Sequence, residues 1–304
     1  MQVIRASVLG FCMGVRRAVD MAWAELTRNR ESGVGRVYSI GPLIHNPQVI
    51  EKLKNAGLID LEEKVGSDSV PQNLSGSVVI IRAHGISPKV EEDLLSRGAS
   101  LADATCPRVK AAQLKARSLA EEGYSIFLAG EKDHAEVVGI CSYAAGAGPM
   151  PAHTGIQTEC LVVSNAEDAR MEAERLFREA PNTRAALLGQ TTMQEDIYRS
   201  IGEGIRHYFP DLKIINSLCR SAPQKAMMEL CGKTDALIVA GGRSSANTRR
   251  LLGIAQDLGK PAWLVETVAE LPPEIAQYLV AGLSAGASTP DEIIVEIENA
   301  LLKL

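Results

Sequence analysis

Short runs of apolar residues alternate along this chain with longer segments in which apolar residues recur every three or four positions. The short runs predict strands buried on both faces, and the longer segments, often roughly 10–18 residues, predict helices. The expected strands are Val3–Leu9, Val37–Ile40, Val78–Arg82, Ser125–Ala129, Leu161–Ser164, Ala185–Gly189, Ile214–Asn216, Ala236–Ala240, Ala262–Val265 and Tyr278–Leu283. This alternation predicts an α/β protein with parallel sheets covered by helices.

Functional residues are expected in the loops at the carboxyl ends of the strands. In open parallel sheets, ligands bind beyond the carboxyl ends of the strands. One further loop is expected from Ala144 to Gly155, where Ala, Gly and Pro are concentrated.

Three cysteines share one local setting, in which an apolar run and a short turn precede the cysteine and a helical segment follows it. They are Cys12, Cys106 and Cys219, separated by 94 and 113 residues, about one α/β lobe each. The start of a helix favours a thiolate over a thiol. Three thiols at the mouths of three lobes can converge on one point, as an iron–sulfur cluster with one iron free of protein sulfur requires.

The remaining cysteines, Cys141, Cys160 and Cys231, are expected to be small core residues. Cys231 precedes Gly232, which predicts the end of a helix, the wrong end for a thiolate ligand.

The N-terminal residues lack the features of a signal peptide, so we expect a cytoplasmic protein. In a reducing compartment, the six cysteines are expected to be metal-bound, catalytic or buried rather than disulfide-bonded.

The length of 304 residues predicts two or three lobes. The expected divisions are 1–102 with Cys12, 103–215 with Cys106, 216–288 with Cys219, and a C-terminal helix in 289–304 that packs back on the body. The net charge of −5, without a basic tract, argues against a nucleic-acid partner. No stretch approaches the roughly 20 apolar residues of a membrane span, so no membrane association is expected.

Three histidines, His45, His84 and His134, lie in loops that follow or adjoin predicted strands. A lone histidine is usually structural, but three in this position suggest a shared anion, because imidazoles donate to phosphate oxygens. Glu136, two residues after His134, is the candidate proton donor near the start of a helix. The alternative for Glu136 is an ordinary carboxylate on a helix surface.

Three further loops combine hydroxyl, amide and glycine residues after a predicted strand. They are Gln190-Thr191-Thr192, Gly241 to Asn247, and Gly286 to Pro290. Glycine lets the backbone approach a ligand, and hydroxyls at a helix N-terminus bind phosphate readily. Ordinary helix capping would explain any one of these loops. Together with the three histidines, they favour a ligand the size of a diphosphate.

A rival pattern, Gly282-Leu283-Ser284-Ala285-Gly286, matches the nucleophile elbow of α/β-hydrolases. In that fold the catalytic histidine follows the serine in the chain. The last histidine of this chain is His207, upstream of Ser284, so the hydrolase reading fails.

Nearly end to end, the chain resembles the LytB (IspH) family of 4-hydroxy-3-methylbut-2-enyl diphosphate reductases of non-mevalonate isoprenoid synthesis. The motifs that carry the resemblance are Gly10-Phe11-Cys12-Met13-Gly14-Val15, His45-Asn46, Ala83-His84-Gly85, Asp103-Ala104-Thr105-Cys106-Pro107, Gln190-Thr191-Thr192 and Ala285-Gly286-Ala287-Ser288.

The resemblance implies a three-lobed, trefoil-like arrangement of parallel-sheet α/β lobes around a central 4Fe-4S cluster. It implies that Cys12, Cys106 and Cys219 hold the cluster. It also implies that the diphosphate is bound by His45, His84, His134, Ser245, Asn247 and Ser288. Thr191 and Glu136 would serve the substrate hydroxyl, and an external one-electron donor such as ferredoxin or flavodoxin would feed the cluster.

This sequence departs from the family pattern at a few positions. Ala246 stands where the family usually has a second serine, Ala135 where it has proline, and the segment after Cys219 also differs. Two alternatives follow: a diverged paralogue that reduces another allylic or phosphorylated compound, and a non-enzymatic cluster protein for electron transfer or redox sensing. Glu136 and Thr191 favour catalysis, because electron transfer needs neither.

Overall fold

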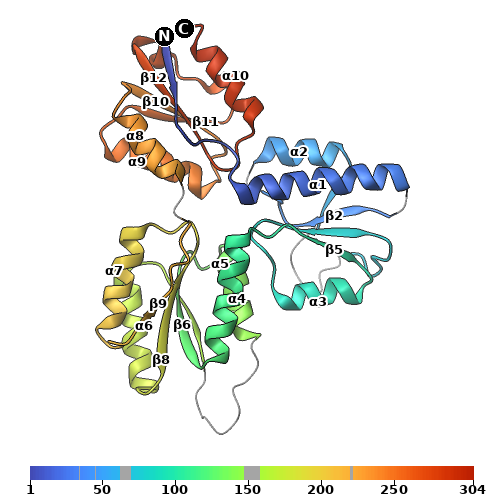
Figure 1. Cartoon of the computed structure of the whole chain (residues 1–304), viewed down its shortest axis with the longest axis vertical. Coiled ribbons are helices and arrows are strands. Elements are labelled where there is room, and N and C mark those ends of the chain that lie inside the picture. Colours follow the sequence, from blue (N-terminus) through green and yellow to red (C-terminus); the bar gives the residue numbers. More distant parts are fainter. Residues whose placement is uncertain (34, 45, 62–69, 147–157, 220–221) are drawn as a thin grey trace. The chain divides into compact units, whose positions relative to one another are not determined.

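The computed structural model describes residues 1–33, 35–44, 46–61, 70–146, 158–219 and 222–304. Within these residues the strands form three four-stranded sheets. The chain divides into two compact units, one formed by Met1–Asp60 with Arg220–Leu304 and the other by Leu61–Cys219 (Figure 1).

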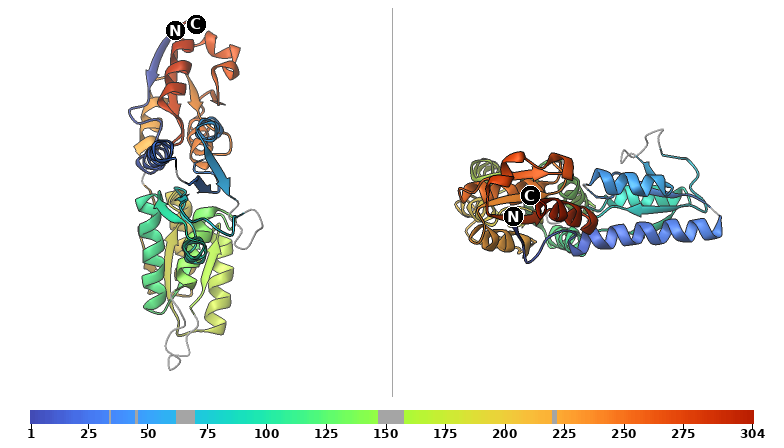
Figure 2. Two further views of the ribbon diagram at one scale, coloured as in Figure 1. Left: turned by 90° about the vertical axis from the view of Figure 1, so that its right-hand side faces the viewer. Right: turned by 90° about the horizontal axis from the view of Figure 1, so that it is seen from above.

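The first unit contains a parallel sheet that joins the two ends of the chain. Its order is β1-β12-β10-β11, formed by Gln2–Arg5, Val280–Ala285, Ala236–Ala240 and Ala262–Val265. Helices α8 (Ala222–Cys231) and α9 (Ala246–Asp257) cover one face, and α10 (Asp291–Leu301) covers the other (Figures 1 and 2). Short 3₁₀ turns at Val268–Glu270 and Pro273–Gln277 lie between β11 and β12.

The second unit contains a parallel sheet of order β7-β6-β8-β9, formed by Cys160–Val163, Tyr124–Ala129, Arg184–Gly189 and Lys213–Ile214. Helices α4 (Pro107–Glu121) and α5 (Ala135–Ala145) pack on one face. Helices α6 (Ala166–Glu179) and α7 (Glu195–Arg206) pack on the other (Figure 1). Strands buried on both faces explain the nearly continuous apolar runs in the sequence.

The remaining sheet has the order β3-β2-β4-β5, formed by Leu58–Leu61, Val37–Ile40, Val78–Ile81 and Ser100–Asp103. Its connecting helices are α1 (Met13–Ser32), α2 (Pro47–Asn55) and α3 (Pro88–Ser96). Helices α2 and α3 begin alike, with proline in the first turn and an Asn46 or Ser87 side chain that accepts a backbone N–H three residues on. Such caps satisfy N–H groups that have no partner inside the helix.

The predicted class, parallel α/β in three lobes, is confirmed. Three strands have the predicted bounds, β2, β10 and β11. Strand β1 ends at Arg5 rather than Leu9, and β3 and β5 were not expected. The lobe boundaries at 102, 215 and 288 stay a prediction. A loop was expected from Ala144 to Gly155. Its first two residues, Ala144 and Ala145, are instead the last residues of α5, and residues 147–155 lie outside the described part.

The expectation that no cysteine forms a disulfide was wrong for one pair. Cys141 of α5 is bonded to Cys160, the first residue of β7. The physical reason lies in the packing: both residues border the core between α5 and β6, which brings their Cα atoms to 5.6 Å. That separation suits a disulfide.

In the described part of the chain, no helix combines the length and apolar character needed to cross a bilayer.

Candidate active site

A buried carboxyl group and a threonine form the centre of the candidate site in the second unit. Glu136 is 2% exposed and lies in the first turn of α5. The Thr191 backbone N–H donates to Glu136 Oε1 at 2.6 Å, and Thr191 Oγ1 donates to Glu136 Oε2 at 3.0 Å. Glu136 is therefore not the surface carboxylate of the alternative interpretation.

The sheet explains why two residues 55 positions apart meet. Strand β6 pairs with β8, with Ala129 opposite Gly189, so the loops after these strands leave the sheet side by side. Gln190 links the two loops, because its N–H donates to Ala129 O at 2.7 Å and its Oε1 accepts from Glu131 N at 3.0 Å. The convergence expected at the carboxyl ends of parallel strands is thereby present.

Thr191 also connects the carboxyl group to a cysteine. The Thr191 carbonyl oxygen accepts a hydrogen bond from the Cys219 N–H at 2.7 Å. One residue therefore orients the Glu136 carboxyl through its N–H and hydroxyl, and fixes the backbone of Cys219 through its carbonyl.

Burial raises the pKa of Glu136 to about 7, because the carboxylate form loses its hydration in the protein interior. The two hydrogen bonds from Thr191 favour the carboxylate and oppose part of this effect. A carboxyl group that titrates near neutrality can both hold and release a proton at working pH.

Two of the predicted histidines lie against one another in the same unit. The rings of His84 and His134 meet edge to face, with centroids 5.4 Å apart. His134 caps α5, and its Nδ1 accepts the Glu136 N–H at 3.2 Å. In the neutral ring the proton then lies on Nε2, which makes that atom a hydrogen-bond donor.

Cys106 is connected to the loop that carries His84. The Cys106 N–H donates to Ala83 O at 2.9 Å, directly before His84. The next residue, Gly85, has a φ of 74°, and a Cβ there would lie 2.4 Å from Nε2 of the buried Gln113. Glycine is thus required at this turn, both for its backbone conformation and for space.

In the first unit, Cys12 is connected to the loop that carries Ser288. The Cys12 N–H donates to Ala287 O at 3.0 Å, and Ser288 is 4% exposed. Gly10, two residues before Cys12, has a φ of 81°, and a Cβ there would lie 2.9 Å from Ile294 Cδ1. Because glycine has no Cβ, the chain after β1 can pass close to α10.

The predicted loops after β10 and β12 pack around one buried threonine. Ser245 caps α9 by accepting the Thr248 N–H at 3.4 Å. Thr248 is fully buried, and Cβ atoms at Gly241 and Gly286 would lie 3.0 and 2.0 Å from its Oγ1. The side-chain Nδ2 of Asn247 is buried without a hydrogen-bond partner in the structure. A buried donor without a partner is costly, which suits a group that binds a ligand.

The cysteine thiols suit an iron–sulfur group by their chemistry. Cys12 and Cys106 occupy the N-cap positions of α1 and α4, and neither side chain makes a capping hydrogen bond. Cys12, Cys106 and Cys219 are not part of a disulfide. Cysteine sulfur is the ligand that iron–sulfur clusters use. Among the described residues, no three His, Cys, Asp or Glu side chains stand together as a metal site.

The remaining residues discussed from the sequence are His45, Cys231 and Ser284. His45 lies outside the described residues. Cys231 is the last residue of α8 and is buried, and burial raises the pKa of its thiol, as expected for a core cysteine. Ser284 is fully buried inside β12 rather than at a turn, which removes the hydrolase alternative on geometry as well. Gln113 and Thr248 were missed, because neither stands in a recognisable motif.

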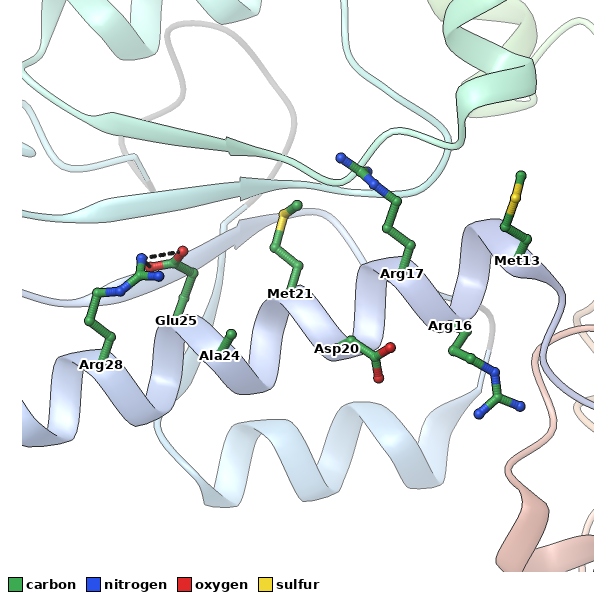
Figure 3. A pocket seen from close by; sticks show the side chains of 8 residues that line it. All are labelled: Met13, Arg16, Arg17, Asp20, Met21, Ala24, Glu25 and Arg28. Carbon is green, nitrogen blue, oxygen red and sulfur yellow. Dashed lines mark hydrogen bonds and ion pairs between the residues drawn. The ribbon is translucent and has the colours of Figure 1, made fainter.

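A pocket of about 750 Å³ lies along α1 (Figure 3). One helix supplies all of its lining residues: Met13, Arg16, Arg17, Asp20, Met21, Ala24, Glu25 and Arg28. Arg28 pairs with Glu25 at 2.6 Å. None of the predicted substrate-binding residues lines it, so we do not place the substrate there.

The fold and its strand-end loops define a class of parallel α/β protein with cysteines at the starts of two helices and a buried carboxyl group linked through Thr191 to the backbone of a third cysteine. The chain belongs to the LytB protein family, whose sequence profile matches residues 3–302. The resemblance found in the motifs is thereby confirmed.

Named relatives and solved structures agree with this membership. The chain is 42% identical to the 4-hydroxy-3-methylbut-2-enyl diphosphate reductase of Treponema denticola, over all of both chains. It is 36% identical to that of Aquifex aeolicus, over 99% of this chain and 96% of the relative.

The structure of the Plasmodium falciparum E-1-hydroxy-2-methyl-but-2-enyl-4-diphosphate reductase matches with a TM-score of 0.82 and 28% identity, over 98% of this chain and 87% of that one. A second reductase structure, described as the terminal enzyme of the non-mevalonate pathway, matches over all of both chains with a TM-score of 0.72 and 35% identity.

Proposed function

We propose that the chain reduces 4-hydroxy-3-methylbut-2-enyl diphosphate to isopentenyl and dimethylallyl diphosphate. The reaction takes two electrons and two protons and releases the allylic hydroxyl as water. Relatives that match over their full length carry this reductase name. The observation that carries the proposal is the buried Glu136 carboxyl, bonded to Thr191, whose carbonyl holds the Cys219 N–H.

Glu136 and Thr191 are proposed to deliver a proton to the leaving hydroxyl. When Glu136 is protonated, its hydrogen bond with Thr191 reverses: the carboxyl O–H donates to Thr191 Oγ1, and the Thr191 hydroxyl donates in turn to the substrate oxygen. The 3.0 Å separation of Oε2 and Oγ1 suits this transfer. Because the hydroxide would be a poor leaving group, its protonation lowers the barrier for breaking the C–O bond.

The diphosphate is proposed to be bound by His84, His134, Ser245, Asn247 and Ser288, together with His45. Imidazole N–H, hydroxyl and amide groups donate to phosphate oxygens, and Ser245 stands at the start of a helix. Fixing the charged end of the substrate holds its hydroxyl at one position, which is mainly a contribution of orientation. Ala246 supplies no hydroxyl, so one donor of the family pattern is missing.

Cys12, Cys106 and Cys219 are proposed to hold a 4Fe-4S cluster. When bound, such a cluster supplies the two electrons and a Lewis-acidic iron without a protein ligand. We propose that the electrons arrive singly from an external carrier such as ferredoxin or flavodoxin. The cytoplasmic location stays a prediction.

The direct test is anaerobic turnover of 4-hydroxy-3-methylbut-2-enyl diphosphate by cluster-reconstituted protein with a strong one-electron reductant. We expect both five-carbon diphosphates as products. If a sample with intact cluster gives no turnover, the diverged paralogue becomes the better account. The non-enzymatic alternative leaves the buried Glu136–Thr191 pair without a role.

The pH dependence of this reaction is set by Glu136. The protonated form is the proton donor, and the pKa of this group lies at about 7. We therefore expect kcat/KM to be level below this pKa and to fall about tenfold per pH unit above it. A pH profile of kcat/KM checks this, because it reports groups of the substrate-free enzyme. A profile that rises through pH 7 would contradict the role of Glu136 as an acid.

A further inference from the structure

The disulfide between Cys141 and Cys160 joins helix α5 to strand β7. The other four cysteines of the chain are not part of a disulfide. Both bonded cysteines are partly exposed, and both border the core between α4, α5 and β6. We propose that this pair is a reversible thiol–disulfide exchange site, which is reduced by a dithiol and which ties α5 to the sheet when oxidised.

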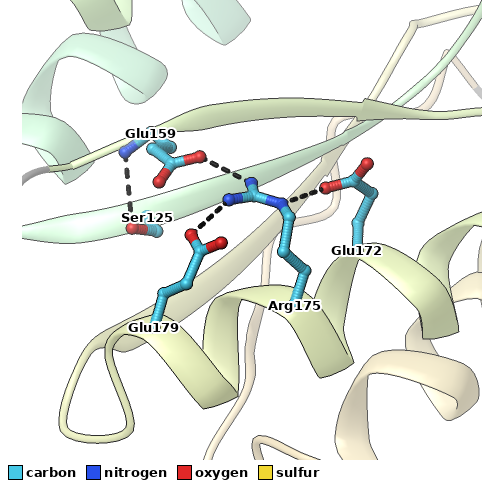
Figure 4. Close-up of polar contacts among 5 residues, drawn as sticks. All are labelled: Ser125, Glu159, Glu172, Arg175 and Glu179. Carbon is cyan, nitrogen blue, oxygen red and sulfur yellow. Dashed lines mark hydrogen bonds and ion pairs between the residues drawn. The ribbon is translucent and has the colours of Figure 1, made fainter.

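The β7 side of the bond is anchored without it. Cys160 stands opposite Ile126 in the ladder between β6 and β7, and the Ile126 N–H donates to Glu159 O at 2.7 Å. The Glu159 carboxylate meets Arg175 of α6 at 2.7 Å, and its N–H donates to Ser125 Oγ at 3.4 Å (Figure 4). Cys160 therefore keeps its place whether or not the disulfide is formed.

The α5 side is held by side chains. Val137 and Ile140 are fully buried against the sheet, and the Tyr143 hydroxyl accepts from Lys110 Nζ of α4 at 3.0 Å. Such contacts allow a helix to loosen without breaking a strand ladder. Breaking the disulfide therefore affects α5 rather than β7. Glu136 lies in the first turn of α5, five residues before Cys141. Reduction of the disulfide would therefore loosen the helix that carries the candidate proton donor.

Reduction of this site consumes one dithiol. A dithiol gives two electrons and two protons, the bond between the two sulfur atoms breaks, and the dithiol leaves as a disulfide. Oxidation reverses each change. The bond closes a loop between residues 19 positions apart. In the loop-entropy account, a link of this span shifts the unfolding equilibrium by roughly 200-fold.

Peptide mass spectrometry tests the exchange directly. The reconstituted protein is equilibrated anaerobically in mixtures of reduced and oxidised dithiothreitol, and its thiols are then alkylated. We expect the Cys141 and Cys160 peptides to pass reversibly between dithiol and disulfide. The peptide with Cys231, which is buried, should carry a thiol throughout and serves as the control. A pair that stays reduced in every mixture, or stays oxidised while the protein is folded, would overturn the proposal.

Hydrogen exchange tests the structural effect. In the reduced protein we expect the amides of α5 to exchange about 10- to 100-fold faster, with those of α6 unchanged, and the Tm to fall by roughly 5–10 °C. Cys160→Ser should match the reduced protein in every mixture. Equal α5 exchange in both redox states would refute the tie. None of these readouts uses turnover, so their failure is distinct from a failure of the proposed reaction.

Discussion

Replacing Glu136 by glutamine is expected to abolish turnover while the cluster stays in place. Glutamine keeps an oxygen that accepts the Thr191 N–H, and its amide can donate to Thr191 Oγ1, so both contacts of the carboxyl group have a substitute. What disappears is the proton that the leaving hydroxyl needs. Loss of a general acid typically costs 10²- to 10⁴-fold in rate, so we expect a fall of about that size.

Steady-state turnover of reconstituted Glu136→Gln, with its iron content measured in the same sample, checks this result. The matched control is Glu131→Gln, because Glu131 is an exposed glutamate on the same loop and only its backbone N–H contacts Gln190. The control should keep its activity. Unchanged turnover in Glu136→Gln would remove Glu136 from the mechanism.

Replacing Cys106 or Cys219 by serine is expected to bring the iron and sulfide content after reconstitution close to background. Neither cysteine is part of a disulfide, and a backbone hydrogen bond holds each of them, from Cys106 N–H to Ala83 O and from Cys219 N–H to Thr191 O. A hydroxyl in the same place lacks the thiolate that iron–sulfur clusters use. Turnover should be lost together with the cluster.

The control for these variants is Cys231→Ala. Cys231 is 2% exposed at the end of α8, and burial raises the pKa of its thiol, so it is a core residue rather than a ligand. This variant should bind as much iron as the unaltered protein. Iron analysis and the visible absorption of the reconstituted samples give the answer. If Cys219→Ser kept the full iron content, the proposed ligand set would be wrong.

The fold was predictable wherever strands are buried on both faces. Strands β2 and β10 are buried at every position, and their predicted bounds are those of the structure. The two strands that were not expected, Leu58–Leu61 and Ser100–Asp103, lie at the two edges of one sheet. Asp60 in the first is exposed, and Asp103 in the second is partly exposed. Edge strands carry charge and expose more of their length, so the apolar signal that marks a strand is weaker there.

The candidate site was predictable as a set of loops but not as a set of contacts. The residues after β6 and β8 were recognised separately. The hydrogen bonds between Glu136 and Thr191, however, form only because these two strands are neighbours in the sheet. Spacing along a chain does not give strand order. The Cys141–Cys160 disulfide and the packing of Gly286 against Thr248 were missed for the same reason, since each joins elements that only the folded sheet brings together.

The pairing of β1 with β12 also sets an order of events during synthesis. Strand Gln2–Arg5 can pair only after Val280–Ala285 has been made. The Cys12 N–H likewise has its hydrogen-bond acceptor only once Ala287 has been made. At ribosomal rates of about 5–20 residues per second, the first strand remains unpaired for on the order of tens of seconds. Cys12 thus reaches its place only after the segment through Ala287 has been made. The three cysteines proposed as cluster ligands are therefore all in place only after that segment has been translated.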